Sequence, residues 1–117
     1  MNINSLLNKI KKHPDYGRAG MLLCHNGVVR SFSQNKKKVK GLRISVDHEK
    51  LDRIIEENKK RPGIIEILVE IIEDKDLYVG DDIMYLIVAG DIRDNVIATL
   101  KDTLDAIKTN VTKKEEF

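Results

Sequence analysis

The stretch that most constrains the fold runs over residues 80–108, GDDIMYLIVAGDIRDNVIATLKDTLDAIK. It opens with turn chemistry, because glycine tolerates positive φ and aspartate can hydrogen-bond its own backbone. Residues 83–89 are continuously apolar and rich in β-branched side chains, which is typical of a strand covered on both faces. Gly90 then breaks the pattern, so the strand is predicted to end at a tight corner.

A long amphipathic helix is predicted after this corner. Asp91 is the expected N-cap, with Asp94 three residues later in the position of a capping-box acid. Lys108 lies near the C-terminal end of the helix, where a cation complements the helix dipole. Apolar residues at helical spacing predict one inward face, made of Ile92, Val96, Ile97, Leu100, Leu104 and Ile107.

The N-terminal part of the chain predicts a helix and then a strand. Residues 3–10 show a short amphipathic pattern, with Asn2 or Asn4 as the cap. Residues 20–29 predict a strand in which Gly27 suggests a bulge or a close backbone approach.

The middle of the chain predicts a strand, a helix and another strand after a basic loop. Residues 42–46 alternate between apolar and polar side chains, as in a half-buried strand. Asp47 is the expected cap of the next helix, which Pro62 and Gly63 end. Residues 64–72 form a strongly β-forming run.

The predicted order is helix, strand, strand, helix, strand, strand, helix, followed by a polar and extended tail over residues 109–117. Because there is no regular βαβ alternation, the sequence predicts a single α+β domain over residues 1–117, with an antiparallel or mixed sheet that carries helices on one face. The apolar runs 64–72 and 83–89 are candidates for a sheet edge that forms a homodimer.

Composition limits the possible functions. The 117 residues carry 21 basic and 19 acidic side chains, a net charge of +2, which disfavours a nucleic-acid binder. Cys24, the only cysteine, is expected to pack as a small core side chain. The three histidines lack metal-ligand spacing, so neither a metal nor a cofactor is assigned. No segment resembles a signal peptide or a membrane span, so a cytoplasmic location without membrane contact is expected.

Several short motifs, taken in their order and spacing, resemble the large catalytic subunit of molybdopterin synthase, the MoaE family. Residues 13–30, HPDYGRAGMLLCHNGVVR, are similar to the family's N-terminal block, which leads into a strand ending in G-x-V-R. Residues 80–83 match its Gly-Asp strand start, and the ungapped distance from Gly80 places Lys108 on the family's first catalytic lysine. The resemblance covers nearly the whole chain and implies the family's hammerhead-like α+β fold.

The chain departs from the family pattern at several points, one of which is Ile72-Glu73 in place of an earlier His-Arg pair. Ile92 stands before Arg93 where the family carries a His-Arg pair, so only the arginine is kept. The tail lacks the family's Pro-aromatic-Trp element, and Lys113 is the expected counterpart of its second lysine. His25 occupies a strand position where the family usually has an aromatic residue, so it is expected to be a packing residue with a hydrogen-bonded imidazole.

The resemblance implies sulfur transfer in molybdenum cofactor biosynthesis. In the family, a small ubiquitin-like subunit (MoaD-like) carries sulfur as a thiocarboxylate and adds it to cyclic pyranopterin monophosphate, which forms the dithiolene. The pocket combines residues of two large subunits, so a homodimer is implied. The candidate catalytic residues are Lys108 and Lys113, and the candidate anion-binding residues are Arg30 and Arg93.

Three of the four candidates also have a purely structural interpretation. Lys108 could be an ordinary lysine at a helix end, and Lys113 a solvated tail charge. Arg93 could be a solvated side chain that pairs with Asp91 or Asp94. For the whole chain, the alternative is a non-catalytic dimeric module that binds a pterin, another anion or a protein partner.

Overall fold

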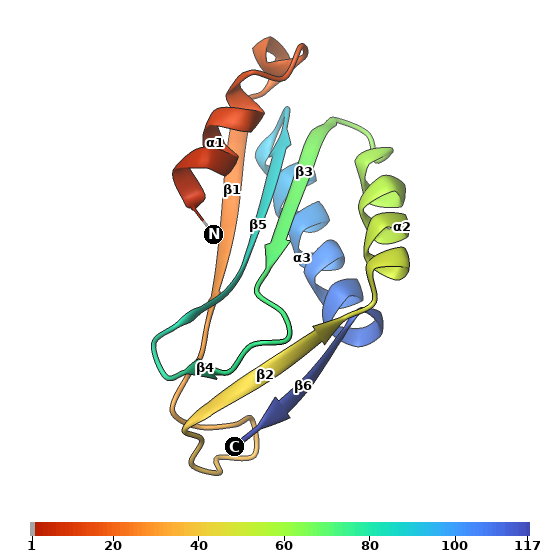
Figure 1. The fold of residues 1–117 in the computed structure, drawn as a ribbon. Coiled ribbons are helices and arrows are strands. Elements are labelled where there is room, and N and C mark those ends of the chain that lie inside the picture. The colour runs from red at the N-terminus through yellow and green to blue at the C-terminus, as the bar shows by residue number, and fades with distance from the viewer. Residues whose placement is uncertain (1) are drawn as a thin grey trace.

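The computed structural model describes residues 2–117, which form an α+β domain as predicted (Figure 1). A short 3-10 helix and six strands accompany three α-helices. In chain order the elements are α1 (Ile3–Lys11), η1 (Tyr16–Arg18), β1 (Met21–Val28), β2 (Gly41–Val46), α2 (His48–Lys59), β3 (Ile64–Ile71), β4 (Leu77–Tyr78), β5 (Asp82–Gly90), α3 (Arg93–Asn110) and β6 (Thr112–Glu116).

The strands form two antiparallel sheets instead of one. The first sheet has the order β1-β5-β3, and the second has the order β4-β2-β6. In Figure 1 the second sheet lies at the end of the molecule where α3 finishes. The predicted bulge in β1 is confirmed, since the register with β5 shifts between Gly27 and Val28.

The position of β5 corrects the expectation that residues 83–89 supply a dimer edge. Ile87 of β5 lies opposite Cys24 of β1 on one side and Leu68 of β3 on the other. Both edges of β5 are therefore hydrogen-bonded within the chain. The free edges of this sheet belong to β1 and β3.

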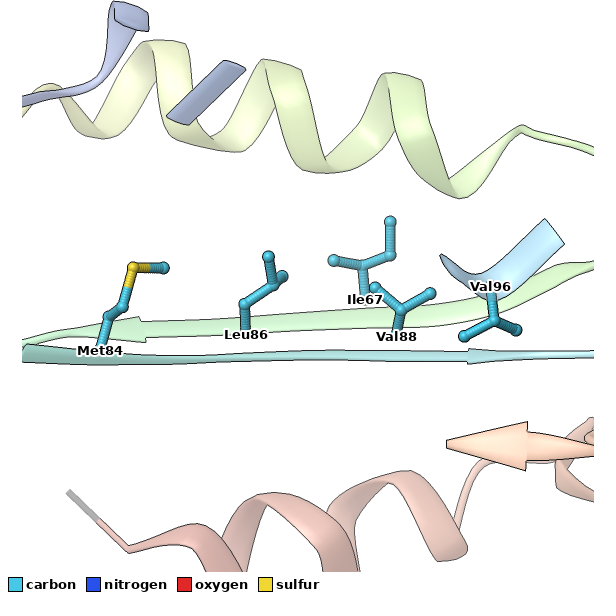
Figure 2. Close-up of a cluster of buried hydrophobic side chains, with 5 residues drawn as sticks. All are labelled: Ile67, Met84, Leu86, Val88 and Val96. Carbon is cyan, nitrogen blue, oxygen red and sulfur yellow. The ribbon is translucent and has the colours of Figure 1, made fainter. Parts of the chain in front are cut away.

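Helices cover both faces of the first sheet, whereas the sequence predicted helices on one face only. Leu86 and Val88 of β5 pack with Val96 on the side of α2 and α3 (Figure 2). The intervening Ile87 packs with Ile10 of α1 on the opposite side. Because side chains alternate along a strand and every residue here is apolar, each face of β5 needs its own cover.

The predicted caps of the first two helices are confirmed. The Asn2 side chain accepts a hydrogen bond from the Asn4 N–H at 2.9 Å at the start of α1. The Asp47 carboxylate accepts one from the Lys50 N–H at 3.1 Å at the start of α2. In both helices a side-chain oxygen satisfies a main-chain donor that the first turn leaves without an intrahelical partner.

The third helix begins one residue later than predicted. Its N-cap is Ile92, which has no side-chain capping bond, so the assignment of Asp91 as the N-cap was wrong. Asp91 still stabilises the corner, because its carboxylate accepts hydrogen bonds from the Ile92 N–H at 2.6 Å and the Asn95 side chain at 2.9 Å.

The inward face of α3 also differs from the prediction. Ile92 and Ile97 were expected to be buried, but they are 57% and 46% exposed. Val96 and Ile97 are adjacent, about 100° apart around the helix, so only one of them can lie at the centre of the buried face. Threonines, which an apolar pattern does not reveal, complete that face, and its buried residues are Val96, Thr99, Thr103 and Ile107.

The tail after Lys108 is more ordered than predicted. Residues 109 and 110 continue α3, and the extended part is a strand, β6, which pairs with β2. The pairing runs from Thr112 opposite Val46 to Glu116 opposite Leu42. The sequence TKKEE carries no apolar alternation, so nothing in it indicated a strand.

Candidate functional site

A cavity lies between β1, the second sheet and the C-terminal end of α3. Its volume is about 580 Å³, which lies within the range of small-molecule sites. Apolar side chains form much of its wall, including Leu42, Ile44, Ile71 and Ile83.

The charged side chains of this cavity are mainly basic. Arg30, Lys108 and Lys114 line it, against a single carboxylate from Glu116. The Glu116 carboxylate lies 3.8 Å from the Lys114 Nζ, so it partly neutralises that lysine. The remaining cations on a partly apolar wall favour an anionic ligand.

Lys108 reaches the cavity from the last turns of α3. The preceding residue, Ile107, is fully buried and also lines the cavity, so packing fixes the helix end that carries Lys108. Lys108 itself is exposed, and its ammonium has no salt bridge to any residue in 2–117. Its charge is therefore available to a bound anion.

Arg30 reaches the same cavity from the chain just beyond β1. Its neighbour Val29 is buried, and its main chain is tied to the turn before β5. The Val29 N–H donates to the Asp81 carbonyl at 2.9 Å, and the Val29 carbonyl accepts from the Gly80 N–H at 2.9 Å. These bonds hold the backbone beside Arg30, whose guanidinium forms no salt bridge within residues 2–117.

The structure thus brings Arg30 and Lys108 together, but it leaves Arg93 and Lys113 outside this cavity. Arg93 opens α3 fifteen positions before Lys108, which corresponds to about 22 Å along the helix axis. Lys113 lies in β6 between Thr112 and Lys114, which both line the cavity. Since successive strand side chains point to opposite faces, Lys113 points away.

Lys114 and His25 are cavity residues that sequence reasoning did not place there. The signal for Lys114 would have been the alternation of β6, which requires knowing that the tail pairs with β2. His25 was expected to have a hydrogen-bonded imidazole, but no such bond forms within residues 2–117. Burial lowers the pKa of the His25 imidazole, and the nearby charge of Lys108 lowers it further.

The remaining sequence expectations concern Cys24, metals and membranes. Cys24 is exposed rather than part of the core, although partial burial of its thiol raises its pKa. Among residues 2–117, no three His, Cys, Asp or Glu side chains gather where they could hold a metal ion. No helix in this range combines the length and apolar content that crossing a membrane requires.

The fold is similar to that of solved structures of molybdopterin synthase and MoaE proteins. The structure of molybdopterin synthase from Staphylococcus aureus matches with a TM-score of 0.80 at 20% identity, over 100% of this chain and 85% of that chain. A MoaE protein from Burkholderia ambifaria matches with a TM-score of 0.79 at 20% identity, over 97% and 75%. At these identities the likeness shows a shared fold.

A third similar structure is a complex of subunits 1 and 2 of the molybdopterin-converting factor from Helicobacter pylori. It matches with a TM-score of 0.73 at 16% identity, over 99% of this chain and 78% of that chain. No curated protein sequence matches this chain.

The sequence model of the MoaE protein family matches residues 1–110. The chain therefore belongs to the MoaE family, which confirms the resemblance found in the sequence. Family membership connects the chain with molybdenum cofactor biosynthesis.

Proposed function

We propose that the basic cavity transfers sulfur from a thiocarboxylated MoaD-like subunit to cyclic pyranopterin monophosphate, which forms the dithiolene. The observation that carries this proposal is the joint presence of Arg30 and Lys108 in one cavity. These residues lie 78 positions apart in the chain. Both were candidates from the sequence, Lys108 through the family resemblance and Arg30 through its place at the end of a strand.

The proposed roles follow from the chemistry of the side chains. The planar guanidinium of Arg30 suits the substrate phosphate, with which it can form paired charge-assisted hydrogen bonds. Lys108 is the proposed catalytic residue, either for proton transfer or for a transient covalent link to the acyl group. The apolar wall around Leu42, Ile44 and Ile83 offers a ligand nonpolar contact beside these cations.

Two adjacent residues, Lys113 and Lys114, are candidates for the second lysine of the site. The sequence favoured Lys113, but Lys114 lines the cavity of its own chain. We therefore propose Lys114 as the second cation of this cavity. A role for Lys113 would require a surface outside the cavity, such as the one that receives the small subunit.

Arg93 fits the proposal only through a homodimer. It lies too far along α3 to meet a ligand that Lys108 contacts in the same chain. In the family the pocket combines residues of two large subunits, so a homodimer offers Arg93 the cavity of the other copy. The two-subunit complex from Helicobacter pylori supports a MoaD-like partner for this chain.

A non-catalytic binding module is the alternative function. Ile92, an apolar residue that is 57% exposed, stands where the family carries a histidine. The β6 strand also replaces the family's Pro-aromatic-Trp tail. On this alternative the cavity still binds an anion, and the small subunit still docks, but no sulfur is transferred.

The test is single-turnover conversion of cyclic pyranopterin monophosphate with a thiocarboxylated small subunit. Wild type should form the dithiolene product, and Lys108→Ala should not. Lys101→Ala is the matched control, because Lys101 is an exposed lysine of the same helix whose ammonium pairs with Asp105 at 3.1 Å and lies outside the cavity.

Three other results would change the conclusion. Binding of the small subunit without product would favour the non-catalytic module. If the small subunit does not bind and no product forms, both functions are overturned. Equal product from wild type and Lys108→Ala would remove Lys108 from the proposed mechanism.

A further inference from the structure

His25 lies in the proposed anion site, and its imidazole has no hydrogen-bond or ion-pair partner within residues 2–117. It lines the same cavity as Arg30 and Lys108, and its side chain is half-buried. The imidazole leans over Gly27, since its Nε2 would lie 3.5 Å from a Cβ placed on that glycine. Because Gly27 has no side chain, nothing from that position covers the ring nitrogen on the cavity side.

The other two histidines of the chain show a different arrangement. His13 lies 3.8 Å from the Glu66 carboxylate, and His48 lies 2.7 Å from the Glu73 carboxylate. Neither of them lines the cavity. Within residues 2–117, His25 is thus the histidine without a carboxylate partner.

The charges around His25 favour its neutral form while the cavity is empty. Lys108 of α3, Lys114 of β6 and Arg30 contribute positive charge, against Glu116. The residue of β5 that pairs with His25 is the apolar Leu86, which offers no compensating carboxylate. Burial and the charge of Lys108 together lower the pKa of the imidazole.

A bound dianion would reverse this balance. It would offset the surrounding positive charge and place an acceptor within reach of the imidazole, and both effects favour the protonated ring. We propose that His25 contacts the bound anion directly and takes up a proton when the anion binds. This inference rests on the proposed function in taking the same cavity as the phosphate site, and it adds a titratable recognition residue to that site.

Sulfate is a suitable probe because it remains a dianion from pH 5 to pH 8, so any pH dependence of its binding belongs to the protein. The signal of each histidine ring can be followed by NMR titration of the wild-type protein, with and without sulfate. Sulfate should raise the pKa of His25 by about one unit, which corresponds to a tenfold tighter binding of sulfate at low pH than at high pH.

Substitutions of the histidines test whether the pH dependence of sulfate binding comes from His25. His25→Phe should bind sulfate with little dependence on pH, and His25→Gln serves the same purpose if the phenylalanine variant fails to fold. His13→Gln and His48→Gln are matched controls, because they remove a titratable ring outside the cavity. Both controls should keep the wild-type pH dependence.

The proposal is overturned if sulfate leaves the titration of His25 unchanged, if sulfate does not bind, or if His25→Phe keeps the pH dependence. These measurements need neither the small subunit nor the pterin. A chain without sulfur transfer can therefore still confirm the role of His25. Conversely, if the protein transfers sulfur but binds sulfate with the same affinity at every pH, the role of His25 is overturned and the proposed function stands.

Discussion

Lys114 lies opposite Ile44 in the antiparallel pairing of β6 with β2, and both side chains line the cavity. Lys113, opposite Ser45, belongs to the other face of the same strand. The two lysines are adjacent and both exposed, so they form a natural pair for testing which face of β6 binds the anion.

We predict that Lys114→Met weakens sulfate binding and that Lys113→Met leaves it nearly unchanged. The Lys114 side chain is 45% exposed, so solvent screening limits its contribution to about 1 kcal/mol, or roughly a fivefold change in Kd. Calorimetric titration with sulfate at pH 6 measures both variants. Equal losses would indicate a diffuse effect of net charge instead of a contact in the cavity.

Much of this fold could be predicted because its signals are local. The apolar run of β5 and the caps Asn2 and Asp47 each depend on a few neighbouring residues, and the structure confirms them. The starting point of α3 was missed by one residue, because two adjacent positions, Asp91 and Ile92, compete for the cap and only the three-dimensional corner decides between them.

The cavity could not be predicted in the same way, because it depends on contacts between distant parts of the chain. Lys108 was identified through the family resemblance and Arg30 through its place at the end of a strand, but nothing in their local sequence indicated that they meet. Lys114 was missed because its orientation follows from the pairing of β6 with β2, which the polar sequence of the tail conceals. His25 was taken for a packing residue because its surroundings were not visible in the sequence.

Two glycines with positive φ differ in the space around them, and this predicts different costs of substitution. Gly63 has φ +78°, and a Cβ there would overlap the Asp91 carboxylate and the Asn95 amide. Gly80 has φ +92°, and a Cβ there would meet no atom within 4 Å. Gly80→Ala should therefore cost only the left-handed conformation, about 1–2 kcal/mol of the free energy of unfolding.

Gly63→Ala should cost at least about 1 kcal/mol more than Gly80→Ala, because it also displaces the carboxylate that supports the start of α3. Urea denaturation of both variants measures the difference. Equal costs would mean that the corner between β5 and α3 shifts to make room for the new methyl group.

Truncating a buried apolar side chain beneath α3 and an exposed one on α3 should have very different effects on stability. Leu86 of β5 is fully buried against α3, so Leu86→Ala should lower the free energy of unfolding by roughly 2–5 kcal/mol. Ile97→Ala should change it by less than about 0.5 kcal/mol, since Ile97 is 46% exposed and alanine has the higher helix propensity. Denaturation curves compare the two directly. A large loss for Ile97→Ala in a dimeric sample would indicate that the exposed face of α3 contacts the second copy.

The carboxylate of Asp91 predicts a pH-dependent contribution to stability. Hydrogen bonds from the Asn95 side chain and the Ile92 N–H hold the pKa of Asp91 below its usual value. A carboxyl whose pKa is lower in the folded state stabilises that state above its unfolded pKa of about 4, and the effect disappears as pH falls through the folded pKa. Asp91→Ala should therefore be less stable than wild type at pH 7, by a margin that shrinks below pH 4.

Urea denaturation of wild type and Asp91→Ala at several values between pH 7 and pH 2.5 measures this margin. Asn95→Ala is the matched variant, because it keeps the carboxylate and removes the first of its two donors. With that donor gone, the pKa of Asp91 should return towards its usual value. This variant should therefore be less stable than wild type at pH 7 and should lose less stability than wild type as the pH falls below 4. A margin that stays constant down to pH 2.5 would show that Asp91 acts through its shape at the corner and not through its charge.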